Sequence, residues 1–487
     1  MSDAPLILGV SGLRGIVGES LTPDVATTYA AAFGHWLVEH SGQDRPRVII
    51  GRDGRAGGES LQTSVVRGLA GAGCRVDAAG VCTTPTVGFE ADKGGYAAGV
   101  VLTASHNPQQ WNGIKLLTVT DGVTAAPNAK SASDIIAGFN AWNKDIGANA
   151  EVVTTIEHST RDHVEHIVQR TTALCGTSPA YAHRVVTDSV NSSGGPGCRE
   201  LAKHLGLDLH QLFDDGSGIF PHTPEPTREN LSGSGGLCDA VPGLKADIGF
   251  AQDPDADRLA IIDERGHYIG EEYTLALCAM SVLDAMGDDA RDTVLVANLS
   301  TSRMIDDVAA KYGARVERTP VGEANVVERM LELKAAGQRV ALGGEGNGGV
   351  IWPEVVYVRD SLGSMALTLA LMARTGKSVS QLVQDINALS AGGSGYAIVK
   401  RKVNIASKAD AEPAVQAVTA WAKTLDGAKI DTQDGVRVDF DTGDWAGSWV
   451  HVRASNTEPI MRLICESPTE ATAASVLTAT EHAIAGT

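Results

Sequence analysis

A serine in a short polar turn is the first residue of this chain that could act as a nucleophile. Ser105 and His106 lie in the segment 103–108, which follows the apolar run 97–102 and ends in an Asn-Pro turn signal. The apolar run predicts a buried strand, so the Ser105 hydroxyl would be held rigidly and still reach solvent. Lys115 could place a positive charge near the Ser105 hydroxyl. A rigid hydroxyl beside cations suits nucleophilic or phosphoryl-carrier chemistry. The alternative is a turn in which the serine caps a backbone N–H.

Three aspartates at every second position predict a site for a divalent cation. Asp253, Asp255 and Asp257 follow a second apolar run, and alternate residues of an extended segment share one side. Without a cation such close carboxylates would repel one another and take up protons, whereas all-oxygen ligation suits Mg²⁺. An EF-hand loop is an alternative because Glu264 occupies the place of its last ligand, but Arg258 stands where that loop needs glycine and the flanks are strand-like. A solvated acidic turn is the remaining alternative.

Two further segments carry polar groups that suit a phosphate and a polyhydroxyl ligand. The segment 453–462 holds two arginines around hydroxyl and amide side chains, which suits a phosphate clamp or an ordinary surface turn. The segment 343–349 has the glycine spacing of a dinucleotide fingerprint, but the strand-like run 350–352 follows where that motif needs a helix. Such a glycine-rich loop suits close approach to a polyhydroxyl ligand, with Glu345 accepting from hydroxyl groups; a flexible turn is the alternative.

These four segments in this order resemble the α-D-phosphohexomutase superfamily, which covers phosphoglucosamine mutases, phosphomannomutases and phosphoglucomutases. The resemblance covers nearly the whole chain, and the segment 11–15 is similar to the opening active-site segment of the family. It implies an isomerase, an intramolecular phosphotransferase that interconverts hexose 1-phosphate and hexose 6-phosphate through an enzyme phosphoserine and a bisphosphorylated sugar. Phosphoglucosamine mutase is the expected activity, and phosphomannomutase/phosphoglucomutase is the alternative.

The resemblance also implies a role for each matching residue. Ser105 would carry the phosphoryl group and would share one Mg²⁺ per chain with the ligands Asp253, Asp255 and Asp257. The residues that would surround the reacting phosphate, with the second and third as candidates for proton transfer, are Arg14, His106, Lys115 and Arg258. The residues that would bind the sugar and the phosphate that is not reacting are Glu345, Asn347, Arg453, Ser455, Asn456, Thr457 and Arg462. Hexose 1,6-bisphosphate would serve as activator and intermediate.

Two departures from the family pattern bear on this site. The metal loop has Pro254 and Ala256 where many members have glycine, while its carboxylates are retained. In the glycine-rich loop Asn347 replaces a serine, and Gly349 stands where bacterial members often have histidine. A histidine contact to phosphate or sugar is therefore missing or supplied elsewhere. This version of the loop looks more like archaeal-type phosphoglucosamine and phosphomannose mutases.

Length, charge and cysteine usage limit the class of protein and its partners. A chain of 487 residues, 43% of them hydrophobic, suffices for three or four folded domains. The net charge of −19 opposes binding to nucleic acid or to an anionic membrane. The ligand that the resemblance implies is a small-molecule hexose phosphate. No signal peptide or membrane-spanning run is evident, and seven cysteines without a Cys-x-x-Cys pair suit a reducing compartment. We therefore expect a cytoplasmic monomer or homodimer.

The elements that must position these residues can be predicted from the apolar patterns. Strand, polar turn, helix and strand recur in three stretches, which begin at residues 47, 184 and 293, as in parallel βαβ units. The tail differs, with a helix over 411–423 that has Asp410 as a possible N-cap, three short strands and a closing helix over 469–484. We expect an α/β fold of three similar domains with mixed, largely parallel sheets and a smaller C-terminal α+β domain around a central active-site cleft. The expected domains are 1–155 with the phosphoserine loop, 156–265 with the metal loop, 266–385 with the sugar-binding loop and 386–487 with the phosphate-binding loop.

Two other classes of protein remain possible from the sequence. A serine hydrolase could use Ser105, but His106 is its immediate neighbour and poorly placed as its base, and no Gly-x-Ser-x-Gly elbow is present. An inactive sugar-phosphate-binding sensor would keep the phosphate clamp and lose the serine or the carboxylates, which are intact here. The variant Ser105→Ala separates mutase from sensor, because only the mutase loses its function.

Overall fold

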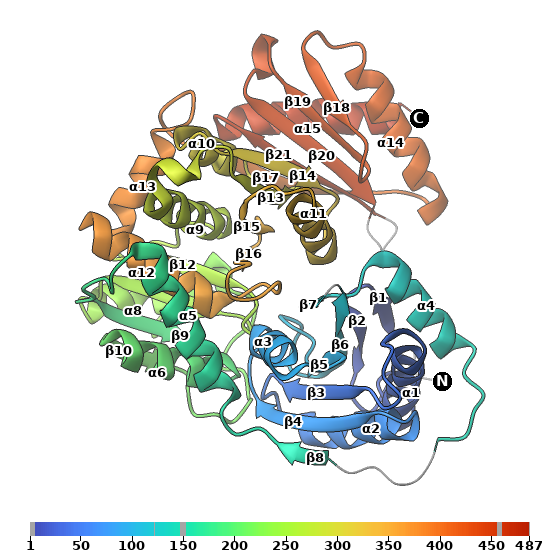
Figure 1. Ribbon diagram of the computed structural model, residues 1–487. Helices are drawn as coiled ribbons and strands as arrows, with labels where there is room; N and C mark the ends of the chain where they lie inside the picture. The colour runs from blue at the N-terminus through green and yellow to red at the C-terminus, as the bar shows by residue number, and fades with distance from the viewer. Residues whose placement is uncertain (1–4, 121, 147–151, 455–459, 487) are drawn as a thin grey trace.

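Four β-sheets follow one another in chain order along an arc, and each carries helices (Figure 1). The computed structural model describes residues 5–120, 122–146, 152–454 and 460–486. We call each sheet with its helices a unit and number the units in chain order. Three mixed α/β units and a smaller antiparallel fourth unit confirm the expected fold class. The exact domain limits stay a prediction.

The first unit has the largest sheet. Its strands are β1 (Ile7–Gly9), β2 (Gly12–Ile16), β3 (Arg47–Arg52), β4 (Arg75–Val81), β5 (Ala98–Leu102), β6 (Trp111–Thr120), β7 (Val123–Ala125) and β8 (Val152–Thr155). Its helices are α1 (Pro23–His40), α2 (Gly58–Gly71), α3 (Thr84–Gly94) and α4 (Ala129–Asn140). The strand order is β1-β2-β6-β5-β3-β4-β8, with β7 on β6. Strand β3 runs parallel to β4 and β5, whereas β6 pairs antiparallel with β5 and β2.

The apolar pattern of β3 shows why helices cover both faces of this sheet. Val48 and Ile50 pack in a cluster with side chains of α1 and α2, whereas Ile49 packs in the cluster that contains Val87 and Phe89 of α3. Successive side chains of a strand point to opposite faces, so a continuous apolar run needs cover on both.

The second and third units repeat one four-stranded plan. The second has β9 (Arg184–Asp188), β10 (Asp208–Leu212), β11 (Ile248–Gln252) and β12 (Leu259–Asp263), with α5 (Ser159–Cys175), α6 (Gly194–Leu205), α7 (Arg228–Leu231) and α8 (Leu237–Gly243). The third has β13 (Val294–Asn298), β14 (Arg315–Thr319), β15 (Val340–Glu345) and β16 (Gly349–Ile351), with α9 (Glu271–Met286), α10 (Met304–Lys311), α11 (Glu323–Ala335), α12 (Ser361–Thr375) and α13 (Val379–Asn387). In each sheet three strands are parallel and the last is antiparallel. The three predicted parallel βαβ units, β3–α2–β4, β9–α6–β10 and β13–α10–β14, are confirmed.

The fourth unit is a five-stranded antiparallel sheet with two helices. Its elements are β17 (Ala397–Asn404), α14 (Ala411–Ala422), β18 (Ala428–Asp431), β19 (Val436–Phe440), β20 (Ser448–Ala454), β21 (Ile460–Ser467) and α15 (Glu470–Ala485), in the strand order β17-β21-β20-β19-β18. Asp410 is the N-cap residue of α14 as predicted, but its side chain makes no capping bond to the helix. Its carboxylate instead accepts from Ser407 N at 2.7 Å and Ser407 Oγ at 2.9 Å.

The hydrophobic core of the fourth unit is separate from the core that the first three units share. One cluster contains buried side chains from the first, second and third units, including Val87 of α3, Ile167 of α5 and Leu367 of α12. A separate cluster lies entirely within the fourth unit and includes Val438, Val450 and Leu463. Among the described residues, no helix has the length and apolar character that a membrane crossing requires.

The loops that carry the predicted site residues leave corresponding ends of the sheets. Ser105 follows β5, and the metal loop joins β11 to β12. Glu345 ends β15, which runs parallel to β13. In open sheets the carboxyl ends of parallel strands are the ordinary place for a ligand site.

Candidate active site

The Ser105 turn is held in an uncommon backbone conformation by its neighbours. Ser105 has φ of 48°, in the left-handed region that non-glycine residues rarely adopt. Its N–H donates to Thr103 Oγ1 at 2.8 Å, and its carbonyl accepts from Arg55 Nη2 at 2.6 Å. Arg55 is paired in turn with Asp53, Nε to Oδ2 at 2.8 Å, and both side chains are almost completely buried. The hydroxyl is therefore presented by a fixed loop.

The three aspartates of the metal loop lie together with no measurable exposure. They offer one oxygen each within 4.8 Å of one another, and Ser105 Oγ donates to Asp253 Oδ2 at 2.6 Å. Burial, together with Asp255 and Asp257, raises the pKa of Asp253 well above its usual range. Within the described part of the chain, Oδ1 of Asp255 and Oδ1 of Asp257 have no hydrogen-bond partner. Buried carboxylate oxygens in this state fit a hard divalent cation such as Mg²⁺.

Two cations flank the aspartates. Lys115 Nζ lies 2.5 Å from Asp257 Oδ2 and 3.3 Å from Asp255 Oδ2, and the lysine is 5% exposed. Burial alone would lower the pKa of Lys115, but these two carboxylates raise it. Arg258 Nε lies 3.9 Å from Asp257 Oδ1. Lys115 therefore stays charged across the neutral range, which suits it to bind an anion rather than to accept a proton.

His106 and Arg14 complete the group around the serine. His106 Nδ1 lies 3.3 Å from Ser105 Oγ. Burial, followed by the charges of Arg258 and Arg14, lowers the pKa of His106 to about 3, so its ring is neutral at pH 7. Arg14 Nη1 donates to Asn107 Oδ1 at 2.9 Å and to Ala104 O at 3.3 Å, which ties β2 to the serine turn. All eight residues predicted for the serine and metal site thus lie in one cluster.

Both predicted sugar contacts of the glycine-rich loop have protein partners. Glu345 is 5% exposed and accepts from Asn298 Nδ2 at 2.8 Å, Gly322 N at 3.2 Å and Arg359 Nη1 at 2.7 Å. Asn347 Oδ1 accepts from Gly349 N at 3.2 Å. A carboxylate has about four acceptor positions, so Glu345 retains room for one hydroxyl donor.

The predicted phosphate clamp is described only in part. Arg453 and Arg462 are cross-strand neighbours on β20 and β21, and Arg462 is exposed. Arg453 Nε lies 3.1 Å from Asp434 Oδ2, which also accepts from Val321 N of the third unit at 3.1 Å. The other three predicted clamp residues, Ser455, Asn456 and Thr457, lie outside the described residues. Within the described ranges, no hydrogen bond or ion pair joins either arginine to the serine–aspartate cluster.

Several residues that contact this cluster were not predicted from the sequence. Thr84 Oγ1 of α3 donates to Asp255 Oδ2 at 2.6 Å, and Arg359 Nη2 donates to Asp257 Oδ2 at 2.6 Å. Asp53 and Arg55, described above, directly follow the parallel strand β3. That position was a usable signal, because the carboxyl ends of parallel strands meet at one edge. Arg359 follows no such strand, and nothing in the sequence pattern singled it out.

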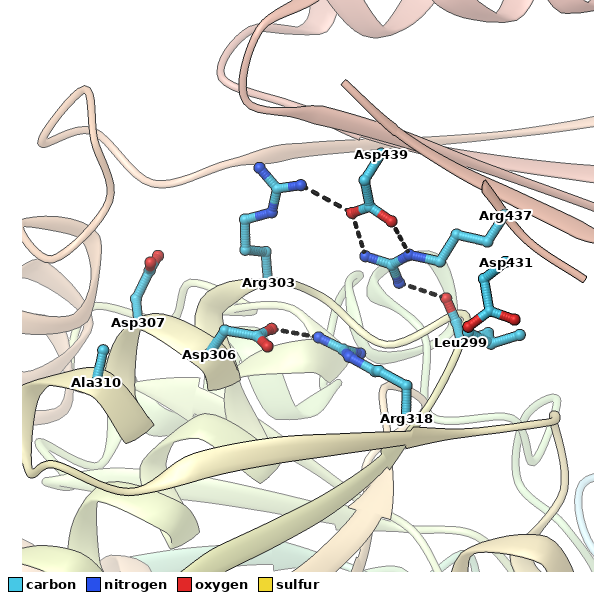
Figure 2. A pocket seen from close by; sticks show the side chains of 9 residues that line it. All are labelled: Leu299, Arg303, Asp306, Asp307, Ala310, Arg318, Asp431, Arg437 and Asp439. Atoms are coloured by element: carbon cyan, nitrogen blue, oxygen red, sulfur yellow. Dashed lines mark hydrogen bonds and ion pairs between the residues drawn. The ribbon is translucent and has the colours of Figure 1, made fainter. Parts of the chain in front are cut away.

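A cavity of about 400 Å³ between α10 and the fourth sheet is separate from this cluster. Figure 2 shows that most of its charged groups are paired with one another: Asp439 accepts from Arg303 and Arg437, and Asp306 pairs with Arg318. None of the predicted site residues lines it. The cavity is therefore part of the junction between the third and fourth units.

Sequence models of known protein families match almost the whole chain. The matches are described as phosphoglucomutase/phosphomannomutase alpha/beta/alpha domain I over residues 5–144, domain II over 161–266, domain III over 271–389 and C-terminal domain over 398–483.

Individual proteins similar to this chain have names that agree with these family matches. A phosphoglucomutase/phosphomannomutase of Thermococcus kodakarensis is 35% identical over 471 residues, which cover 95% of each chain. A probable phosphoglucosamine mutase of Methanopyrus kandleri is 32% identical over 463 residues, which cover 95% of this chain and 94% of its own. The crystal structure of a putative phosphomannomutase from Thermus thermophilus has the same fold, with a TM-score of 0.77 and 24% identity over 98% of both chains.

Proposed function

Because the chain belongs to the phosphoglucomutase/phosphomannomutase family of phosphosugar mutases, we propose that it interconverts hexose 1-phosphate and hexose 6-phosphate through a phosphoserine at Ser105. The observation that carries the proposal is the 2.6 Å hydrogen bond from Ser105 Oγ to Asp253, within a buried cluster of three aspartates. A hydroxyl at that place is held beside the carboxylates that would bind Mg²⁺. A phosphoryl group on it would have its charge balanced there.

The residues of the cluster divide the work of phosphoryl transfer. The residues that would hold Mg²⁺ are Ser105, Asp253, Asp255 and Asp257, and the bound ion would supply charge neutralisation to the transferring group. Lys115 and Arg258 add positive charge on the same side, which suits a transfer that depends mainly on positioning and electrostatics.

The proton of the attacking sugar hydroxyl needs an acceptor. The bond from phosphorus to Ser105 Oγ breaks, a bond to the sugar oxygen forms, and the proton lost by the sugar hydroxyl ends on Ser105 Oγ, which leaves phosphorus as an oxyanion. His106 Nδ1 lies 3.3 Å from Ser105 Oγ, the leaving oxygen, so its ring is placed to pass a proton to that oxygen. Lys115, which Asp257 and Asp255 keep charged here, is the second candidate for proton transfer and would act as a donor. In the second half of the reaction, the other phosphate of the bisphosphorylated sugar returns to Ser105.

The bisphosphorylated sugar must be held by the phosphate that is not reacting. Arg453 and Arg462 are adjacent on the fourth sheet. Asp434 links Arg453 to Val321, which lies between β14 and α11 and precedes Gly322, a backbone donor to Glu345. This link supports a clamp from the fourth unit that reaches toward Glu345. A clamp on a unit with its own core can release and rebind the intermediate without disturbing the serine.

Glucosamine phosphate is the substrate that we propose first. The glycine–asparagine loop and the relative from Methanopyrus kandleri support it. Mannose and glucose phosphates are the second candidates, because the relative from Thermococcus kodakarensis, at 35% identity, is a phosphoglucomutase/phosphomannomutase.

Phosphorus NMR tests the reaction directly. The full-length protein with Mg²⁺ and the matching hexose 1,6-bisphosphate would receive glucosamine 1-phosphate, mannose 1-phosphate or glucose 1-phosphate. We expect a 6-phosphate signal, with the fastest conversion from glucosamine 1-phosphate. Faster conversion of the mannose or glucose compound would move the assignment to the second candidate. No conversion of any of the three by protein phosphorylated at Ser105 would contradict the proposed function.

The variant Ser105→Ala isolates the phosphoserine step. It removes one oxygen from a loop whose backbone contacts are made by Thr103 and Arg55, so the fold should persist. We expect turnover to fall at least 1000-fold, on the scale seen when a nucleophile is removed, while calorimetric binding of the sugar phosphate is retained. Turnover within tenfold of wild type would show that Ser105 does not carry the phosphoryl group.

A further inference from the structure

Arg359 joins carboxylates from two different units. Its Nη2 donates to Asp257 Oδ2 of the metal loop at 2.6 Å, and its Nη1 donates to Glu345 Oε2 of the glycine-rich loop at 2.7 Å. Its Nε lies 3.3 Å from Glu323 Oε2 at the start of α11. The side chain is only 10% exposed, so these contacts are shielded from water. One guanidinium group therefore fixes the relative position of the two loops.

The partners of Arg359 leave free the atoms that a ligand would need. Asp257 Oδ2 accepts from both Arg359 and Lys115, whereas Asp257 Oδ1 has no hydrogen-bond partner among the described residues and only Arg258 Nε at 3.9 Å. Glu345 keeps one acceptor position, as described above. Arginine keeps its charge in proteins, so this guanidinium group can pair with Asp257, Glu323 and Glu345 at once.

The absence of a side chain at Gly349 makes room for Arg359. A Cβ atom at Gly349 would lie 2.3 Å from Arg359 Cδ, far inside van der Waals contact. Arg359 cannot swing away, because its far end is bonded to Asp257 and Glu345. The space beside Gly349 is thus filled by the stem of Arg359. The positive charge in this part of the loop comes from Arg359.

The residues that follow Arg359 hold the metal loop at a second point. Ser361 N donates to Ala256 O at 3.3 Å, and Ser361 Oγ donates to the same oxygen at 2.6 Å. Ala256 has φ of 52° and therefore a left-handed backbone. The start of α12 fixes both the backbone and one carboxylate of the metal loop.

We propose that Arg359 is a positioning residue that couples the metal site to the sugar site. The inference rests on the proposed function of the two loops as metal and sugar sites. Lysine cannot replace arginine in this role, because a single ammonium group does not span two carboxylates in fixed geometry. A residue that serves both sites should affect the binding of both ligands when it is changed.

Two titrations of the full-length variant Arg359→Lys test the coupling. The first measures the dissociation constant of Mg²⁺ alone by calorimetry. The second measures the dissociation constant of glucosamine 1-phosphate, mannose 1-phosphate or glucose 1-phosphate in the presence of a chelator. We expect both constants to rise about tenfold, as for other groups that orient metal ligands. The matched control is Arg374→Lys, at the other end of α12, where Arg374 pairs with Asp284 and donates to Ser281 O. The control should leave both constants unchanged.

The outcomes separate the inference from the proposed function. A change in only one constant, or in neither, would overturn the coupling role of Arg359. Absence of turnover by the wild-type protein in the NMR assay would overturn the proposed function instead. A wild-type protein that turns over, with an Arg359→Lys variant that keeps both constants, overturns the inference alone.

Gly349→Ala provides a second test that leaves the arginine in place. Its Cβ would displace the Arg359 stem, so the same two constants should rise. The double variant Gly349→Ala/Arg359→Lys should be no weaker in binding than Arg359→Lys, because both changes disturb one contact. Wild-type constants in Gly349→Ala, or additive losses in the double variant, would contradict the role of Gly349 as the space for Arg359.

Discussion

Ser105 and Ala256 both have left-handed backbones, with φ of 48° and 52°, in the two loops that meet at the site. Such conformations cost about 1 kcal/mol or more for a residue with a side chain and persist where the surroundings enforce them. Here the enforcing groups are Arg55 on the Ser105 carbonyl and Ser361 on the Ala256 carbonyl. Contacts within the protein thus hold both loops in these conformations.

The acidic cluster predicts that Mg²⁺ stabilises the folded protein. A ligand at 100 times its dissociation constant adds about 2.7 kcal/mol, so the unfolding midpoint should rise by roughly 3 °C in a protein of this size. Asp255→Asn should lose most of this rise, because it removes one of the three buried carboxylates. Scanning calorimetry with Mg²⁺ and with a chelator measures the effect.

Asp263→Asn is the matched control for that prediction. Asp263 lies on β12 and is also buried, but it pairs with Arg265 and accepts from His267 N. The variant should lower the midpoint and keep the full response to Mg²⁺. A response lost in both variants would show that the metal does not bind at the aspartate triplet.

Residues with local spacing could be predicted from the sequence, and residues with distant partners could not. Asp253, Asp255 and Asp257 were found because their alternation is visible in five positions. Arg359 was missed because Asp257 is 102 positions away, and only the packing of α12 brings the two together. Predicted roles for Ser455, Asn456 and Thr457 stay predictions.

At the scale of elements, Glu264 illustrates how one carboxylate can have two interpretations. In the sequence it stands where an EF-hand would have its last ligand. In the structure it accepts from Ser378 Oγ at 3.0 Å and from Ser380 N at 3.2 Å, at the start of α13. The flanking β11 and β12 form an antiparallel pair, so the EF-hand alternative is wrong. Glu264, directly after β12, thus joins the start of α13 to the second sheet through hydrogen bonds.

Loss of the hydrogen bonds from Ser378 and Ser380 to Glu264 should destabilise the protein, by an amount that depends on pH. Burial alone would raise the pKa of Glu264, but hydrogen bonds from Ser380 and Ser378 lower it below its usual value of 4.5. A lowered pKa means that the stabilisation is present above pH 4.5 and is lost as the pH falls below it. Glu264→Gln should cost about 0.5–1 kcal/mol at pH 7, a range kept low because the group is partly exposed.

Thermal unfolding of wild type and Glu264→Gln between pH 7 and pH 3 measures this dependence. The difference in midpoint should be constant near neutrality and close as the pH falls below 4.5. Glu412→Gln, an exposed glutamate in the first turn of α14, should show no comparable loss. A gap that persists at pH 3 would contradict a charged Glu264 as its cause.

The elements themselves were predictable where apolar runs are long. Each parallel βαβ unit was visible because its first strand, β3, β9 or β13, is an almost continuous apolar run that is buried in the structure. The second strands β10 and β14 are more polar and more exposed, and they were found from their place after the helix. The position of Asp410 as N-cap residue of α14 was predicted, but the hydrogen bonds of its side chain were not. Sequence spacing cannot decide whether the carboxylate accepts from the first turn of α14 or from Ser407.

At the scale of the whole molecule, the division of the core predicts two unfolding transitions. Leu367 lies in the cluster shared by the first three units, and Leu463 lies in the cluster of the fourth unit. Both side chains have no measurable exposure, and a Leu→Ala change at such a position costs about 2–5 kcal/mol. Leu367→Ala should shift only the larger calorimetric transition, and Leu463→Ala only the smaller.

The contacts between the third and fourth units decide how far these transitions separate. They are mainly polar, such as Arg303 with Asp439 and Tyr396 Oη donating to Asp307 Oδ2 at 2.7 Å. Polar junctions stabilise less than shared apolar cores, so the fourth unit should unfold on its own. One transition that both variants shift equally would show that the four units unfold together.

The position of α12 also sets the order in which the protein can fold during synthesis. This helix packs against α5 and α6 of the second unit and against α9, yet it is made long after α5. Its end at Thr375 follows the end of α5 at Cys175 by 200 residues, which a ribosome adds in roughly 10–40 s. During that interval, side chains such as Val164 and Ile167 of α5 lack their final cover. We therefore expect the nascent second unit to expose apolar surface of α5 until translation passes α12.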